Sequence, residues 1–218
     1  MSNRKSLIYI VDDDISVCKA IALLLKLHDF TVETFTCAED FLAFKHLKVP
    51  SCLVLDITLP GINGFALQDT MAVRKLNIPI VFITGYGDVA KSVRAIKAGA
   101  IDFILKSIIQ NKFILKPVTK GKLLRAISVA IGKSKIQNKI EAKAINIRRR
   151  IETLSPKELE VFRFVARGML SKQIASKRGT SLQTIKVQRS HVMHKMHAKT
   201  VTELINLALQ AGIIPSQK

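Results

Sequence analysis

Acidic side chains follow two short apolar segments of this 218-residue chain. Three consecutive aspartates, residues 12–14, come directly after the apolar residues 7–11, and Asp56 directly follows a second apolar segment, residues 52–55. Carboxylates gathered at strand ends repel one another unless a cation lies among them. Hard cations such as Mg²⁺ prefer oxygen ligands, so the pattern predicts a magnesium site and one aspartate that is free for chemistry.

Five short segments of mostly β-branched, aliphatic or aromatic residues must position these side chains, as buried parallel strands do. They are residues 7–11, 31–35, 52–56, 78–84 and 101–105. Apolar residues at helical spacing fill the intervals, at residues 15–27, 38–47, 65–76 and 88–98. We therefore predict an α/β domain with a doubly wound, five-stranded parallel sheet. Ligands of such sheets bind at the carboxyl ends of the strands, where Asp12, Asp13, Asp56 and Thr84 fall.

Charge is distributed unevenly along the chain, whose formal net charge is +19. Residues 1–120 hold 15 Lys and Arg against 11 Asp and Glu, whereas residues 121–218 hold 20 against 5. A second half this basic predicts a polyanionic partner, nucleic acid first; a merely soluble basic surface is the alternative.

Hydropathy and cysteine content bear on whether the protein spans a membrane and on its redox compartment. No window of eighteen apolar residues exists, so we expect no membrane span. The three cysteines, Cys18, Cys37 and Cys52, lack the spacing of a metal site. We interpret them as reduced residues of a cytoplasmic protein.

Four stretches, IYIVDDD, CLVLDITLPGINGF, IPIVFITGYGD and KAGAIDF, resemble in this order a response-regulator receiver domain over roughly residues 5–130. The resemblance implies a flavodoxin-like fold and a phosphoryl group accepted by Asp56. The implied magnesium ligands are Asp12, Asp13, Asp56 and the backbone carbonyl of Thr58. The implied switch residues are Thr84, whose hydroxyl binds the phosphoryl group, and Phe103.

The chain departs from the receiver pattern after the switch aromatic, where a lysine followed by proline is expected. FILK occurs twice, at 103–106 before Ser107 and at 113–116 before Pro117. Residues 107–116 are therefore interpreted as an insertion, because their deletion restores the pattern. Lys106 keeps its distance from Phe103 and is favoured slightly as the phosphate-binding lysine, whereas Lys116 keeps the proline.

The insertion is rich in apolar residues, so we expect it to pack or to pair as an extra strand beside the site. It puts phosphorylation-driven switching in question. The alternative is a tolerated loop, because loops accept insertions at low cost.

The basic half is predicted to be helical. We expect the receiver domain at 1–131, a helical linker at 132–150, and a small all-α domain at 151–218. Ser155-Pro156-Lys157-Glu158 has the pattern of a capped helix start. Further helices are expected to begin at Ser171, Ser181 and Thr200, and the second and third form a helix-turn-helix around Gly179.

The stretches LSPKELEVFRFVARGMLSKQIA and TIKVQRSHVMHKM resemble a LuxR-type DNA-binding domain over residues 153–211. The whole chain is then similar to a response regulator of the FixJ/NarL type. The resemblance implies that Lys186, Val187 and Ser190 enter the major groove, with Gln188 and Arg189 on or near the same side of the helix. The candidates for phosphate contacts are Lys172, Thr184 and Lys195.

This second domain also departs from its pattern. Arg178 and Thr180 replace aliphatic residues on either side of the turn glycine, and Gln188 replaces a histidine. In a small domain, losing two buried aliphatics costs about a few kcal/mol. We therefore expect DNA binding that is weak or that depends on dimerisation.

Together these patterns predict a cytoplasmic transcription regulator of a two-component system, controlled by phosphorylation of Asp56. The expected partners are a sensor histidine kinase, double-stranded DNA, RNA polymerase and, after phosphorylation, a second copy bound through residues 89–98 and the following strand; no membrane is expected. One alternative is a phosphorylation-independent regulator whose receiver is only a dimerisation module. Another is a Mg²⁺-dependent phosphatase, but Thr58 stands where such an enzyme needs an acidic residue. We therefore expect no independent enzymatic turnover.

Overall fold

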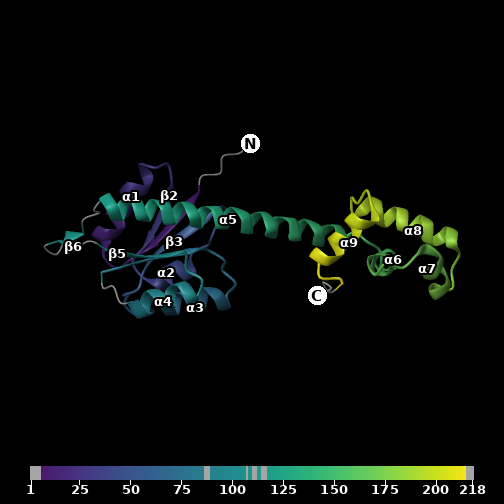
Figure 1. Cartoon of the computed structure of the whole chain (residues 1–218), viewed down its shortest axis with the longest axis horizontal. Coiled ribbons are helices and arrows are strands. Elements are labelled where there is room, and N and C mark those ends of the chain that lie inside the picture. Colours follow the sequence, from purple (N-terminus) through teal and green to yellow (C-terminus); the bar gives the residue numbers. More distant parts are fainter. Residues whose placement is uncertain (1–5, 86–88, 107, 110–111, 114–116, 215–218) are drawn as a thin grey trace. The chain divides into compact units, whose positions relative to one another are not determined.

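The computed structural model describes residues 6–85, 89–106, 108–109, 112–113 and 117–214. Contacts divide the chain into two compact units, Met1–Asn138 and Lys139–Lys218, and each has its own hydrophobic core. Figure 1 shows the helices and strands of each unit in the colours of the sequence. None of the helices in the described part of the chain is both long and apolar enough to cross a bilayer.

The first unit is built on a sheet of five parallel strands in the order β2-β1-β3-β4-β5. They are β1 (Leu7–Val11), β2 (Thr31–Phe35), β3 (Ser51–Asp56), β4 (Ile80–Thr84) and β5 (Asp102–Leu105). Every residue of β1, β3 and β4 is buried, because helices cover both faces of the sheet. The prediction of a doubly wound five-stranded sheet is confirmed.

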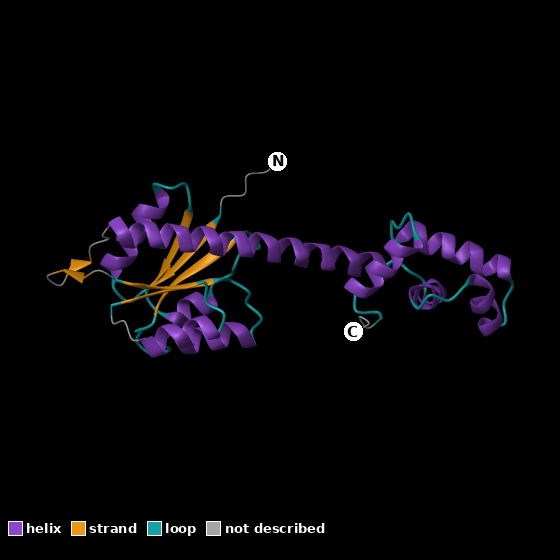
Figure 2. Ribbon diagram, in the orientation of Figure 1, coloured by secondary structure: helices purple, strands orange, loops and turns teal. Residues whose placement is uncertain are grey.

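Helices lie on both faces of this sheet, as Figure 2 shows. They are α1 (Ile15–Lys26), α2 (Ala38–Ala43), α3 (Gly64–Val73), α4 (Val89–Lys97) and α5 (Pro117–Glu152). Side chains of α1 and α5 form the core on one face, with Ile21 and Ile127 among them. Side chains of α2, α3 and α4 form the core on the other face, with Phe41 and Met71 among them.

Helix α2 is shorter than the apolar spacing of residues 38–47 predicts. It ends at Ala43 because Phe44 adopts an extended conformation, with φ −67° and ψ 142°. The Phe44 ring then packs edge-on against Phe35, with ring centroids 5.3 Å apart, and lies 5.8 Å from the His46 ring. Aromatic packing around the end of β2 therefore overrides the helical periodicity.

Helix α5 is one continuous helix where the sequence predicts a last receiver helix and a helical linker. Its first half packs on the sheet through Leu123, Ile127 and Ala130. Ser134, one turn further on, is 2% exposed, and its hydroxyl oxygen accepts a hydrogen bond of 3.0 Å from the backbone N–H of Ser51. This bond ties α5 to the first residue of β3.

The apparent insertion forms a small hairpin. Strands β6 (Ile108–Ile109) and β7 (Lys112–Phe113) pair antiparallel with each other. They form a separate two-stranded sheet and add no strand to the five-stranded one.

The second unit contains four short helices around one core. They are α6 (Pro156–Ala166), α7 (Ser171–Arg178), α8 (Leu182–Lys195) and α9 (Val201–Gln210). Gly179 ends α7 in the left-handed region, with φ +58°. A glycine adopts this conformation without strain, so the chain turns sharply there into α8.

A capping box fixes the start of α6, as its sequence predicts. Glu158 Oε2 accepts hydrogen bonds from the Ser155 backbone N–H at 2.8 Å and from Lys195 Nζ at 2.7 Å. The bond from Lys195 and then the bond from Ser155 lower the pKa of Glu158 from 4.5 to about 2. The Glu158 carboxylate therefore joins the start of α6 to the end of α8.

We predict that Ser134→Ala lowers the free energy of unfolding of the first unit by about 1–3 kcal/mol, because the buried Ser51 N–H loses its partner. The matched control is Ser128→Ala on an exposed part of α5, where the hydroxyl donates to the Leu124 carbonyl. Urea unfolding followed by circular dichroism measures both. Equal losses in the two variants would contradict a specific role of Ser134.

We predict that Glu158→Gln destabilises the second unit by about 1–3 kcal/mol at pH 7, the range for hydrogen bonds to charged groups. The folded pKa lies below the unfolded one, so this stabilisation is complete above about pH 4.5 and is lost as the pH falls toward 2. Hydrogen exchange of the α6 amides at several pH values measures the difference between variant and wild type. Exposed Glu152→Gln is the control; a pH-independent difference in Glu158→Gln would count against this linkage.

Candidate functional site

The strand order brings the acidic segments to one edge of the sheet. Asp12 follows β1, Asp56 ends β3 and Thr84 ends β4. Strand β3 pairs with β1 on one side and with β4 on the other, all in parallel. The three side chains therefore start from neighbouring positions at the carboxyl edge.

Three carboxylates gather at this edge. One oxygen each of Asp12, Asp13 and Asp56 lies within 4.8 Å of the other two, and no other such group is found in the described residues. Asp12 and Asp56 are buried, whereas Asp13 is exposed. The donor set is all oxygen and open to solvent on the Asp13 side, which fits a hard divalent cation.

The Lys106 ammonium lies between the two buried carboxylates. Its Nζ is 2.8 Å from Asp12 Oδ2 and 3.1 Å from Asp56 Oδ2, and the lysine side chain is only 8% exposed. Lys106 reaches this position because it directly follows β5, and its backbone N–H donates to the Thr84 carbonyl at 2.7 Å.

Burial and charge oppose each other in this cluster. Burial raises the pKa of Asp12 to about 6, although the hydrogen bond and the charge of Lys106 lower it. Burial also raises the pKa of Asp56, against the charge of Lys106. Burial lowers the pKa of Lys106, but its contacts with Asp12 and Asp56 raise it more, and the net direction is upward. The lysine is therefore held as a cation.

The backbone around Asp56 fixes the direction of its carboxylate. Oδ1 accepts a hydrogen bond of 2.8 Å from the Ile57 N–H, which leaves Oδ2 for Lys106. Gly64 packs so closely behind the strand end that a Cβ there would lie 2.3 Å from the Asp56 carbonyl oxygen. No pattern in the sequence reveals this contact.

The two expected switch residues occupy different positions. Thr84 is buried, 1% exposed, at the carboxyl end of β4. Phe103 is half-buried in β5, paired in register with Phe82 and packed against the core of α2, α3 and α4. Thr58, whose carbonyl is expected to bind the metal, lies on the exposed loop after Asp56.

The structure places one of the two candidate lysines at the acidic cluster. Lys106 contacts Asp12 and Asp56, whereas Lys116 lies outside the described residues. The hairpin of β6 and β7 begins two residues after Lys106 in the sequence.

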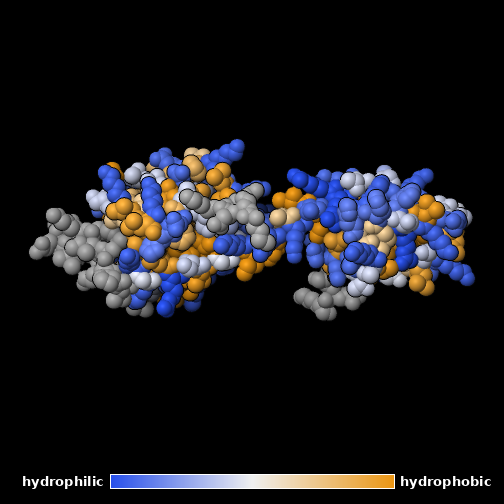
Figure 3. Space-filling view, turned by 90° about the horizontal axis from the view of Figure 1, so that it is seen from above, coloured by the Kyte–Doolittle hydropathy of each residue, from blue (hydrophilic) through white to orange (hydrophobic). Residues whose placement is uncertain are grey.

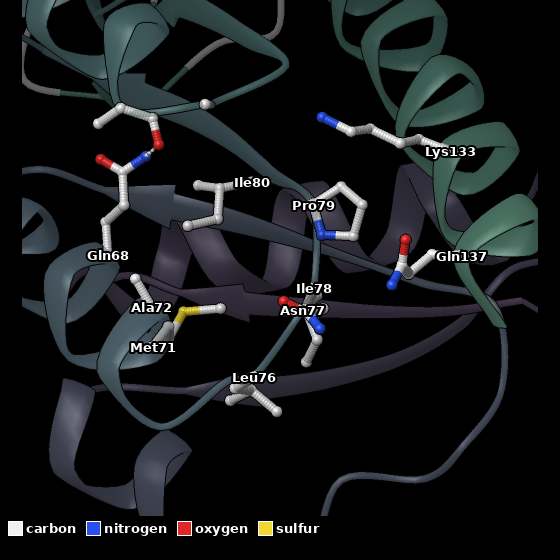
Figure 4. A pocket seen from close by; sticks show the side chains of 12 residues that line it. Gln68, Met71, Ala72, Leu76, Asn77, Ile78, Pro79, Ile80, Lys133 and Gln137 are labelled. Atoms are coloured by element: carbon white, nitrogen blue, oxygen red, sulfur yellow. Dashed lines mark hydrogen bonds between the residues drawn. The ribbon is translucent and has the colours of Figure 1, made fainter. Parts of the chain in front are cut away.

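A separate pocket lies at the opposite end of the strands (Figure 4). It is lined by residues that precede β4 and β5, such as Pro79 and Gly99, and by Lys133 and Gln137 of α5. Its volume is about 270 Å³. Because β4 runs away from it toward Thr84, this pocket is no part of the acidic site.

The second unit presents α8 to solvent, and hydrophilic side chains dominate the face seen in Figure 3. Five of the eight predicted DNA-binding residues are exposed in the structure. They are Lys172, Thr184, Lys186, Val187 and Ser190. The Thr184 hydroxyl also lies 2.8 Å from the Ser181 hydroxyl at the start of α8.

The other three predicted DNA-binding residues make contacts within the unit. Lys195 binds Glu158, Arg189 Nη1 donates to Ser171 Oγ at 3.2 Å, and Gln188 Oε1 accepts from Arg178 Nη1 at 2.7 Å. The bond from Lys195 to Glu158 holds its ammonium on the protein side of α8, so Lys195 is the weakest of the predicted phosphate contacts.

Arg178, which donates to Gln188, was not identified from the sequence as a functional residue. Its Nε lies 3.1 Å from Glu160 Oε2, and the arginine side chain is 15% exposed. The expected loss from replacing a buried leucine is therefore offset by contacts to α6 and α8. Nothing in the spacing of Glu160, Arg178 and Gln188 signals that they meet.

Comparisons with known proteins match each of the two units to a protein family. Residues 8–116 match the family model of the response regulator receiver domain, and residues 152–208 match that of the bacterial regulatory proteins of the luxR family. Nodulation protein W of Bradyrhizobium diazoefficiens is 35% identical over 212 residues, covering 97% of this chain and 89% of its own. The transcriptional regulatory protein FixJ of Rhizobium meliloti is 36% identical, covering 96% and 98%.

Two solved structures cover nearly the whole chain. The response regulator StyR matches with a TM-score of 0.78 at 34% identity, covering 94% of this chain and 98% of its own. Full-length FixJ from B. japonicum matches with a TM-score of 0.53 at 35% identity, covering 96% and 98%. The chain therefore belongs to the response regulators of two-component systems, as a receiver domain joined to a LuxR-type DNA-binding domain.

Proposed function

We propose that Asp56 accepts a phosphoryl group from a sensor histidine kinase and that this controls DNA binding by the second unit. The observation that carries the proposal is the Asp12–Lys106–Asp56 cluster at the carboxyl edge of β1, β3 and β5. It places a nucleophilic carboxylate beside a cation, in a chain that also holds a helix-turn-helix.

The acidic cluster would hold Mg²⁺ through the carboxylates of Asp12, Asp13 and Asp56 and the Thr58 carbonyl. When bound, the ion supplies positive charge that offsets repulsion between Asp56 and the phosphoryl oxygens. Lys106 neutralises two of the same carboxylates, so its ammonium becomes available to the phosphoryl oxygens once another cation binds there. The Thr84 hydroxyl, at the end of the neighbouring strand, is placed to bind a further oxygen.

Phosphorylation adds about two negative charges beside Lys106 and Thr84. Both residues lie at the ends of adjacent strands, and Phe103 precedes Lys106 by three residues in β5. We propose that their rearrangement alters the face formed by α4 and β5. Val93, Ile96 and Leu105 on that face are 45–52% exposed, which suits a homodimer contact.

Two paired DNA-binding units then match two half-sites, whose spacing the dimer symmetry sets. Functional boundaries at 1–131, 132–150 and 151–218 are consistent with the two family matches and with one helix, α5, between them. A DNA-bound dimer beside a promoter would contact RNA polymerase. Free cysteines and DNA as partner favour the cytoplasm.

We propose no independent turnover of small phosphoesters, because Thr58 offers no carboxyl group as a general acid two residues after Asp56. One observation favours a second candidate function, a receiver that serves only as a dimerisation module. The hairpin of β6 and β7 lies directly after Lys106, in the segment through which the switch would act.

We predict that Lys106→Met destabilises the first unit by about 3–5 kcal/mol at pH 7 without divalent cations, because two buried carboxylates lose their shared partner. Added Mg²⁺ then raises the melting temperature of the variant more than that of the wild type. Thermal unfolding with and without Mg²⁺ measures both effects. Lys116→Met is the matched control, and a larger effect of that substitution would assign the site to Lys116 instead.

We predict that acetyl phosphate labels the full-length protein in the presence of Mg²⁺ but not an Asp56→Asn variant. Labelling is expected to increase the molecular mass measured by sedimentation, because the labelled protein dimerises. It is also expected to strengthen DNA binding about 5–150-fold at fixed salt, the usual range of coupling between sites. Labelling of the Asp56→Asn variant would show that Asp56 is not the phosphoacceptor. Labelling of the wild type without a change in mass or DNA affinity would favour the second candidate function.

A further inference from the structure

The pocket at the amino end of β4 is built by several elements of the first unit (Figure 4). Helix α3, the segments that precede β4 and β5, and helix α5 all contribute to its lining. Every lining residue lies within Met1–Asn138, so the cavity of about 270 Å³ belongs to one compact unit. Ligand pockets usually measure about 300–1,000 Å³. A cavity near the lower end of that range suits a small molecule.

Most of the side chains that line this pocket are aliphatic. They include Met71 of α3, Ile80 at the start of β4, and Ile78 and Pro79 just before it. Met71 and Ile80 are 2% and 6% exposed, so they belong to the packed core as well as to the cavity. Removal of an aliphatic ligand from water into such a lining is favourable. None of the described lining residues is aromatic, so the pocket offers no ring on which an aromatic ligand would stack.

The lining carries one positive charge. Lys133 is exposed on α5, and Figure 4 shows its side chain extending from the helix toward the pocket, above Pro79 in this view. Of the described residues that line the pocket, none is acidic. A ligand with one negative charge therefore complements the cavity, whereas a cationic ligand would be repelled.

Two hydrogen bonds fix opposite sides of the pocket. Gln68 of α3 is 7% exposed, and its Nε2 donates to the Ala98 carbonyl, just after α4, at 3.2 Å. Ser134, the residue after Lys133 on α5, accepts from the Ser51 N–H at 3.0 Å. The lining is thus held in place by bonds within the protein. A preformed site loses little conformational freedom when a ligand binds.

We propose that this pocket binds a small aliphatic monocarboxylate, with its chain against Met71 and Ile80 and its carboxylate at the Lys133 ammonium. The lysine ammonium is a point charge with three donors, which suits a carboxylate oxygen. A phosphate monoester, with about two negative charges, would lack a second cation here. The bound carboxylate bridges α5 and the connection from α4 to β5.

The test is an NMR titration of the full-length protein, isotope-labelled in its methionine methyl groups. Hexanoate is the probe, and hexanol is the uncharged control with the same chain length. Met71 lines the pocket, whereas Met169, Met193 and Met196 belong to the second unit. Hexanoate is expected to shift the Met71 signal and to leave those three in place, with a dissociation constant on the order of 1 mM or below. Hexanol is expected to bind about tenfold more weakly.

Three substitutions locate the two ends of the ligand. Lys133→Met keeps the aliphatic stem and removes the charge, so it is expected to weaken hexanoate binding about tenfold and to leave hexanol binding unchanged. Lys135→Met is the matched control, because Lys135 is exposed on the same helix and is outside the lining. Ala72→Leu fills the pocket from an exposed position on α3 and is expected to weaken binding of both probes. Circular dichroism verifies that each variant folds.

Three results overturn the proposal. If the Met71 signal does not move at ten times the expected dissociation constant, the pocket binds no such carboxylate. If hexanol binds as tightly as hexanoate, the pocket does not select a negative charge. If Lys135→Met weakens binding as much as Lys133→Met, hexanoate responds to the net charge of the protein and not to Lys133.

The inference is independent of the proposed phosphorylation, because the pocket and Asp56 lie at opposite ends of the strands. Asp56→Asn is therefore expected to bind hexanoate as tightly as the wild type does. A protein that binds hexanoate but is not labelled by acetyl phosphate would contradict the proposed function and leave this inference intact. Loss of hexanoate binding in Asp56→Asn would contradict the inference.

Discussion

The Asp12 and Asp56 carboxylates lie close enough to share one cation, and that cation is the Lys106 ammonium. Both aspartates are buried at the ends of strands that helices cover on each face. Two such groups without a counter-charge would repel each other and would take up a proton instead. The arrangement of the carboxyl edge therefore depends on a cation, and in this structure the Lys106 ammonium supplies it.

Close packing fixes the backbone of the site around Asp56. Strand β3 is buried throughout, and Gly64 packs against the Asp56 backbone too closely for any side chain. A change of charge at Asp56 must then be answered by groups at the ends of the neighbouring strands. Lys106 and Thr84 are such groups, and the hydrogen bond from the Lys106 N–H to the Thr84 carbonyl joins them directly. Strand β5 continues this connection to Phe103 and to the exposed apolar residues beside α4.

The sequence predicted the sheet and the convergence of the aspartates because both depend on local patterns: buried parallel strands are continuous apolar segments, and their carboxyl ends must meet. It failed where contacts distant in sequence decide. Helix α2 ends at Ala43 because the ring of Phe44 packs with Phe35.

Packing between separate elements also decides which lysine reaches the acidic site and which residues the Arg178 side chain contacts. Two copies of one tetrapeptide fit the pattern almost equally, so the sequence favours Lys106 only slightly. The path of the chain after β5 brings its ammonium to Asp12. Glu160, Arg178 and Gln188 are 18 and 10 residues apart and lie on three separate helices, so no periodicity within one element connects them. Their meeting is a property of how three helices pack, and packing of this kind is not encoded in any short segment.

The chain departs from the family patterns after Lys106 and at Arg178. At both positions, the charge of the side chain is paired with groups on other helices or strands. The Lys106 ammonium binds Asp12, which follows β1, and Asp56, which ends β3. The inserted hairpin begins only after Lys106 in the sequence. Arg178 occupies a position suited to an aliphatic residue, yet carboxylate and amide oxygens from two other helices satisfy its donors. An unpaired charge at either position would cost several kcal/mol, which is why each change is tolerated only together with its partners. In both units, a side chain that pairs with a group on another helix or strand couples the positions of the two elements. A movement of one element then changes the surface that the other element presents to its ligand.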